Sequence, residues 1–104
     1  MSDALATLSA PAVPSDVQAF AAEKGVGRYL NAVIDLARRA FPSSALSVSL
    51  GQDAEDDAHQ YVALDVKVGD LSAEGLLAGQ RAWSEGIRGV CPSRHAVYFV
   101  LGWR

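Results

Sequence analysis

The chain has 104 residues, with nine lysines and arginines against twelve aspartates and glutamates, for a formal net charge of -3. This length suits one compact domain and leaves no room for a large multi-loop active site of the barrel or doubly wound kind. The acidic balance disfavours binding along phosphate backbones, and no apolar run reaches the roughly 18 residues of a membrane span. We therefore expect a soluble protein that uses no cofactor.

The first residues show neither helical nor strand periodicity and contain Pro11 and Pro14. This pattern predicts a flexible tail over residues 1–14 and a single domain over residues 15–104. The tail lacks the basic start and continuous apolar stretch of a signal peptide. Cys91 is the one cysteine, so it has no partner for an internal disulfide. Together these features favour the cytoplasm as the compartment.

Two helices are predicted after the tail. Ser15 and Gln18 have the spacing of a capping box, which favours a helix beginning at Ser15 and ending at Gly25. A second helix is predicted from about Arg28 to Ala40, because a Phe-Pro pair follows and proline disfavours helical geometry in the residue before it. Its apolar arc is wider than that of a surface helix, so we expect it to contact both a sheet and another helix.

The apolar period then changes to two, which is typical of strands with one buried face. Leu46, Val48 and Leu50 alternate with serines, and a second alternating run covers residues 62–68. A long acidic connection over residues 51–60 separates the two runs. This arrangement predicts an antiparallel hairpin.

A third helix is predicted to begin after an N-cap at Ser72 and to end near Val90. Small residues recur along one side of it at helical spacing: Gly75, Gly79, Ala82 and Gly86. Interior glycines weaken a helix, so a stripe of them indicates that another element approaches its backbone closely. We expect the second helix to pack on this stripe while Trp83 and Ile87 face the sheet.

The last segment, from His95 to Trp103, is apolar on both faces and predicts a final strand. The fold class is therefore α+β, in two layers, with the order α-α-β-β-α-β. A right-handed crossover makes the second and third strands parallel, and placing the first strand between them gives a mainly antiparallel sheet of order 2-1-3 with helices on one face. This arrangement resembles a ferredoxin-like fold that lacks its first strand, over residues 45–103, and such a resemblance implies no function.

A sheet with helices on one face leaves its other face uncovered, and mixed aromatic, small and polar residues there suit burial against a protein. The predicted partner-binding residues are Tyr61, Ala63, Asp65, Lys67, Tyr98 and Val100. We expect a domain without catalysis of its own that works as a homodimer or as an accessory subunit. The alternative is that the tail or the first helix covers this face, because Val17 and Phe20 also need burial.

A second hypothesis is a small enzyme or metal-binding protein. The predicted topology brings His59, Cys91 and His95 to one end of the sheet with Asp57, and such residues are ligands of borderline metals. The same cysteine and histidines suggest a nucleophile and its base. Against both, the usual zinc-binding spacings are absent, and Pro92 lacks the backbone N–H that an oxyanion hole at this position would use.

A third hypothesis is weak binding of single-stranded nucleic acid. It would use Tyr61 and Tyr98 as stacking platforms, with Lys67 and Arg94 around them. The negative net charge and the acidic connection oppose it, so we expect nucleic-acid binding to be absent or weak.

Overall fold

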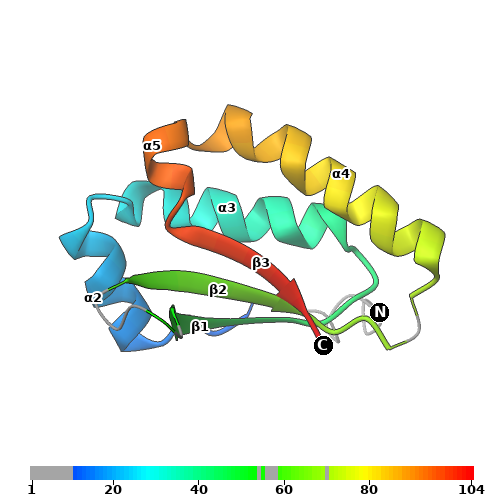
Figure 1. The fold of residues 1–104 in the computed structure, drawn as a ribbon, viewed down its shortest axis with the longest axis horizontal. Coiled ribbons are helices and arrows are strands. Elements are labelled where there is room, and N and C mark those ends of the chain that lie inside the picture. The colour runs from blue at the N-terminus through cyan, green and yellow to red at the C-terminus, as the bar shows by residue number, and fades with distance from the viewer. Residues whose placement is uncertain (1–10, 54, 56–58, 70) are drawn as a thin grey trace, which may run out of the picture.

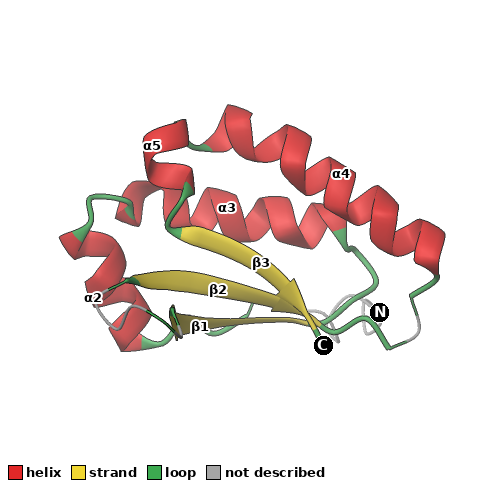
Figure 2. Ribbon diagram, viewed as in Figure 1, coloured by secondary structure: helices red, strands yellow, loops and turns green. Residues whose placement is uncertain are grey.

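The structure, a computed structural model, describes residues 11–53, 55, 59–69 and 71–104. In chain order its elements are α2 (Ser15–Glu23), α3 (Gly27–Ala40), β1 (Leu46–Gln52), β2 (Gln60–Val66), α4 (Ala73–Val90), α5 (Ser93–Ala96) and β3 (Phe99–Trp103) (Figure 1). Helices α3 and α4 lie on one side of the three-stranded sheet, while α2 lies at one end of it (Figure 2). The predicted α+β class is confirmed.

The order of the strands is β1-β2-β3, so the predicted order 2-1-3 is wrong. β1 pairs with β2 antiparallel, and β2 pairs directly with β3 in parallel, which makes the sheet mixed rather than mainly antiparallel. The predicted parallel relation of the second and third strands is confirmed. The inner side chains of β2, those of Val62, Leu64 and Val66, are at most 1% exposed, as expected for a central strand with a neighbour on each side. The half ferredoxin-like arrangement drawn from the order 2-1-3 is overturned with it.

Of the two predicted helix N-caps, the one at Ser15 is wrong and the one at Ser72 is confirmed. Pro14, not Ser15, is the N-cap of α2, and the Gln18 side chain donates to the Val13 carbonyl at 3.0 Å, so the predicted capping box is wrong. Proline fixes a φ that suits the extended backbone of an N-cap, so Pro14 takes that position and the helix begins at Ser15, as predicted. At α4 the Ser72 hydroxyl accepts from the Gly75 amide at 3.0 Å, as predicted.

Helix α4 packs on α3 through its stripe of small residues. A side chain at Gly79 would overlap the Phe41 ring at the end of α3, and one at Gly86 would overlap Leu36 within α3. The two helices therefore approach each other at positions where only glycine leaves enough room. The prediction that the second helix packs on this stripe is confirmed for these two glycines.

The last strand is shorter than predicted. The Pro92 carbonyl accepts from the amides of His95 and Ala96, both at 2.9 Å, and so closes the short helix α5. The strand then begins at Phe99 rather than at His95. A proline at the start of a helix favours helical turns after it. The alternation of apolar residues, on which the strand prediction depended, gives no sign of such a turn.

One hydrophobic core lies between the sheet and the helices, and its buried members come from α2, α3, the three strands and the segments that join them. These are Val17, Phe20, Ala21, Val26, Leu30, Val33, Ile34, Ala37, Val48, Val62, Leu64, Cys91 and Phe99. Trp83 and Ile87 of α4 pack against it while remaining partly exposed. Val17 and Phe20 of α2 thus find burial in this core rather than on the other face of the sheet.

Candidate interaction surfaces

The face of the sheet away from α3 and α4 carries small and polar side chains, and we name it the outer face. Its residues are Ser47, Ser49, Gly51, Tyr61, Ala63, Asp65, Lys67, Val100 and Gly102. Strand pairing sets Ser49, Ala63 and Val100 side by side across its middle. Five of the six predicted partner-binding residues therefore occupy this face together.

Glycines let two longer side chains lie down on the outer face. The Tyr61 ring occupies the space that a side chain at Gly51 would take, and Asp65 Oδ1 lies only 2.7 Å from the position of a Cβ at Gly102. Both side chains are half-buried as a result. The side chains in the middle of the face therefore rise little above the sheet. An aromatic residue lies toward one end of the face and polar residues lie toward the other.

The polar end of the outer face contains a shallow pocket of about 400 Å³. The Arg104 side chain reaches from the end of β3 to β1, where its Nη2 donates to the Ser47 hydroxyl at 2.7 Å. The lining residues are Ala45, Leu46, Ser47, Asp65, Lys67 and Arg104. Two cations and one carboxylate give this pocket a positive balance in a chain of net charge -3.

Tyr98 does not share this face. Its ring packs edge-on against Phe20 of α2, with the ring centroids 5.9 Å apart, and it joins the rim of the core. Tyr98 precedes the first strand residue, so the alternation that would place it beside Val100 does not yet apply. Of the two tyrosines considered as stacking platforms for nucleic-acid bases, only Tyr61 is on the outer face.

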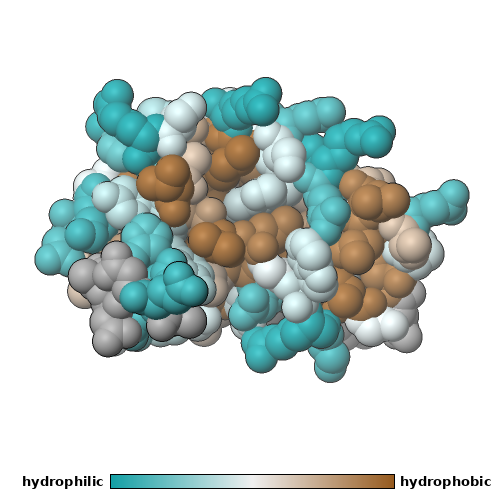
Figure 3. Space-filling view, in the orientation of Figure 1, coloured by the Kyte–Doolittle hydropathy of each residue, from teal (hydrophilic) through white to brown (hydrophobic). Residues whose placement is uncertain are grey.

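A second surface follows β3, and Val100 is the one residue of it that was among the predicted partner-binding residues. Val97 is 60% exposed, Val100 41% and Trp103 47%, so three exposed large apolar residues fall within seven consecutive positions. Figure 3 shows apolar side chains gathering on the face that carries β3 and α4. The sequence did contain a signal, because the final segment is apolar on both faces although only one face can meet the helices.

The residues of the proposed Cys/His site are not brought together. Cys91 is 1% exposed at the end of α4, and burial raises the pKa of its thiol above the ordinary value of 9.0, which opposes formation of a thiolate nucleophile. His95 lies in α5 beside Tyr29, whereas His59 packs near Tyr61, with its ring centroid 6.3 Å from that of the tyrosine. Among the described residues, no three metal-ligating side chains come close enough to hold an ion.

The fourth candidate ligand, Asp57, lies outside the described residues. His95 has a buried Nδ1 with no hydrogen-bond partner in the described part of the chain. Its nearest ring neighbour is Tyr29, at 5.5 Å between centroids. Within the described residues, therefore, no hydrogen bond at Nδ1 orients the His95 ring.

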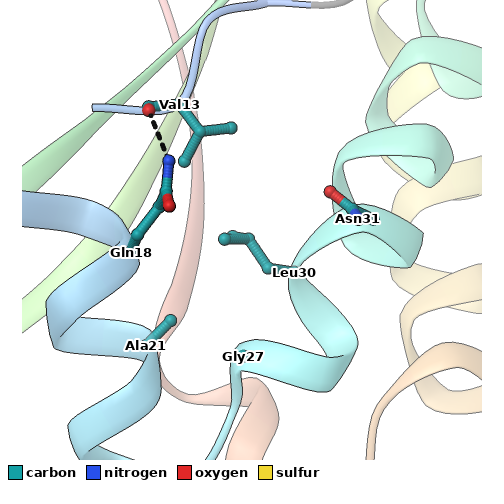
Figure 4. A pocket seen from close by; sticks show the side chains of 6 residues that line it. All are labelled: Val13, Gln18, Ala21, Gly27, Leu30 and Asn31. Carbon is teal, nitrogen blue, oxygen red and sulfur yellow. Dashed lines mark hydrogen bonds between the residues drawn. The ribbon is translucent and has the colours of Figure 1, made fainter. Parts of the chain in front are cut away.

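A second pocket, of about 380 Å³, opens between α2 and the start of α3 (Figure 4). The Gln18 amide spans its mouth to the Val13 carbonyl, and the remaining lining is the apolar side chains of Ala21 and Leu30 with the polar Asn31. None of the described residues that line it has a titratable side chain. The pocket therefore has the character of a packing gap between two helices rather than of a reactive site.

No helix within the described ranges is long and apolar enough to cross a membrane. Comparison with known proteins adds no relative: no protein-family model, no curated protein and no solved structure matches this chain.

Proposed function

We propose that this chain is a protein-interaction domain with no catalysis of its own, and that it works as a homodimer. The single observation that supports it is the exposure of large apolar residues at and just before β3, namely Val97, Val100 and Trp103. An edge strand that exposes a tryptophan and a valine, with another exposed valine just before it, is typical of a surface that is buried against another chain.

Light scattering coupled to size exclusion tests this proposal, with chain at about 100 µM so that affinities of micromolar order register. The expected mass is twice the 11.0 kDa of one chain. On dilution the mass should fall toward that of one chain. A folded protein that keeps the mass of one chain at every concentration overturns the proposed homodimer.

We propose as a second candidate that the outer face holds a segment of a different protein, which would make the chain an accessory subunit. The positive balance of Lys67 and Arg104 over Asp65 in its pocket supports an acidic segment as the occupant. The test is an acidic peptide library screened against the native protein and against Lys67→Glu. Binders that are lost in the variant support the candidate, and equal binding to both proteins contradicts it.

A further inference from the structure

We propose that two copies of the chain pair along β3 in antiparallel orientation, with Leu101 on the two-fold axis. Three strands from each copy then form one continuous sheet. This inference rests on the proposed homodimer and specifies its interface. The helices α3 and α4 of both copies come to lie on the same side of that sheet, and both outer faces lie on the other.

The backbone of β3 supplies the first argument. The Tyr98 carbonyl accepts from Val62 of β2 at 2.7 Å, and the Arg104 amide donates to Val66 of β2 at 3.0 Å. Residues of even number therefore direct their backbone groups toward β2. Because successive residues of a strand point these groups to opposite sides, Leu101 and its odd-numbered neighbours direct theirs toward the free edge.

The free backbone groups are symmetric about Leu101. With the two-fold axis there, Phe99 lies opposite the partner's Trp103, and Leu101 lies opposite the partner's Leu101. The backbone N–H and C=O groups of all these residues point away from β2, so the two residues of each pair form two hydrogen bonds with each other. An axis at Val100 would instead place Val97 opposite Trp103, and Val97 has helical dihedral angles (φ -62°, ψ -17°) that prevent strand pairing.

The side chains fit the same register. Trp103, which is 47% exposed in one chain, comes to lie beside the partner's Phe99 on the helix-covered side. On the outer face, Val100 comes opposite the partner's Gly102, where no side chain competes for the space. Aromatic and β-branched cross-strand neighbours of this kind stabilise a sheet. The pairing thus gives Trp103 an aromatic neighbour and leaves room for the Val100 side chain beside the partner's backbone.

Charge also permits a second copy as the occupant. The strand from Phe99 to Trp103 contains no charged residue, and the first charge after it, Arg104, comes opposite the partner's Tyr98. The Arg104 side chain is held over its own sheet by the Ser47 hydroxyl, and no two like charges face each other across the axis. The antiparallel arrangement is self-complementary and closes at two chains, whereas β3 against β1 of another copy would grow into an open filament.

A disulfide at the two-fold axis tests the register. Leu101→Cys is made with Cys91→Ala, so that 101 is the only cysteine, and the protein is oxidised mildly. Directly opposite Cα atoms in a hydrogen-bonded pair are about 5.5 Å apart, which a disulfide spans. Val100→Cys in the same background is the matched control, because residues 100 of the two copies lie diagonally, at about 7–8 Å. We expect a covalent dimer for Leu101→Cys, and at least about tenfold less for Val100→Cys.

Hydrogen exchange of the unmodified protein is a second measurement that needs no variant. The amides of Leu101 and Trp103 should exchange at least about tenfold more slowly in concentrated than in dilute protein, while the outward amide of Leu50 in β1 should not change. Equal exchange of Leu101 at both concentrations in a protein whose mass doubles overturns the β3 interface and leaves the homodimer standing. A linked Val100→Cys with an unlinked Leu101→Cys overturns the register. A mass of one chain throughout overturns both proposals.

Discussion

The two edge strands of the sheet, β1 and β3, differ in the side chains that they expose. β1 alternates leucine and valine with serine, packs against α2 and exposes no large apolar side chain. β3 begins directly after a helical turn and exposes Val100 and Trp103. Within the described ranges both strands pair with β2 alone, and both turn a row of backbone groups away from it.

The difference shows where the chain resists pairing with other chains and where it does not. Edge strands are commonly protected by polar residues or by a covering element, because an unprotected edge recruits further strands. Serines and the contact with α2 provide such protection at β1. The described residues place no comparable element at β3, which is why the proposed function and its interface are assigned to that edge.

The largest expected effect separates the two edges by charge. Leu101→Lys brings two like charges together at the proposed axis, which costs several kcal/mol, so the dimer should dissociate by a factor of about 100 or more. Leu50→Lys places the same charge on the inner face of β1, where Leu50 is also half-buried, and should leave the dissociation constant within about threefold. Analytical ultracentrifugation measures both constants. A similar loss of dimer in the two variants would mean that the edges are not different.

The next effect concerns the packing that holds α4, and with it β3, on the rest of the fold. Gly79→Leu forces a side chain into the Phe41 ring and should lower the free energy of unfolding by about 3 kcal/mol. Gly89→Ala is the matched control, because nothing lies within 4 Å of a Cβ there, and it should raise stability by about 0.5–1 kcal/mol. Urea unfolding compares them. Unchanged stability in Gly79→Leu contradicts the close contact of α3 and α4.

A smaller effect is expected from truncating the side chains at the two ends of one row across the sheet. Leu46 in β1 and Trp103 in β3 both flank Val66 of β2, so they occupy corresponding places at the two edges. Trp103→Ala should weaken the dimer by about tenfold, since it removes an aromatic contact with the partner's Phe99. Leu46→Ala should lower the stability of the monomer instead, with the dissociation constant unchanged. Concentration-dependent light scattering distinguishes these results.

The smallest effect is expected at Cys91, where the chain leaves α4 on its way to β3. Burial raises the pKa of this thiol above 9.0, so the neutral form is favoured in the folded protein. The resulting stabilisation is present below pH 9.0 and is lost as the pH rises through the folded-state pKa. Cys91→Ala should remove this alkaline decline from a series of urea titrations. At neutral pH iodoacetamide should alkylate Cys91 at least about tenfold faster in the unfolded than in the folded protein.

Sequence patterns predicted the local structure that depends on neighbouring residues. Ser72 is an N-cap because its hydroxyl needs only the Gly75 amide three positions on, and the glycines of α4 recur at helical spacing on the side that meets α3. The order of the strands was not predictable in this way. Alternation specifies which side chains face the core, but it does not say which strands are neighbours, and β1 and β2 alternate alike.

The candidate surface was predicted only in part for a related reason. Ala63, Asp65 and Val100 follow strand parity and lie on the outer face, whereas Tyr98 lies one residue before β3 and turns to Phe20. The exposure of Trp103 was not predicted, because the alternation of side chains along β3 places this residue on the inner face of the sheet. At this end of β3 the inner face is incompletely covered, and the extent of cover depends on how α4 sits.

The absence of a Cβ at Gly102 affects both the outer face and the surface along β3. A methyl group at this position would come within 2.7 Å of Asp65 Oδ1, so the carboxylate would have to stand up from the sheet instead of lying along it. An alanine would thus raise a negative charge beside Lys67 and fill the hollow proposed for the partner's Val100. The topography of the outer face and its electrostatic potential are therefore set together, and one small mutation would change both.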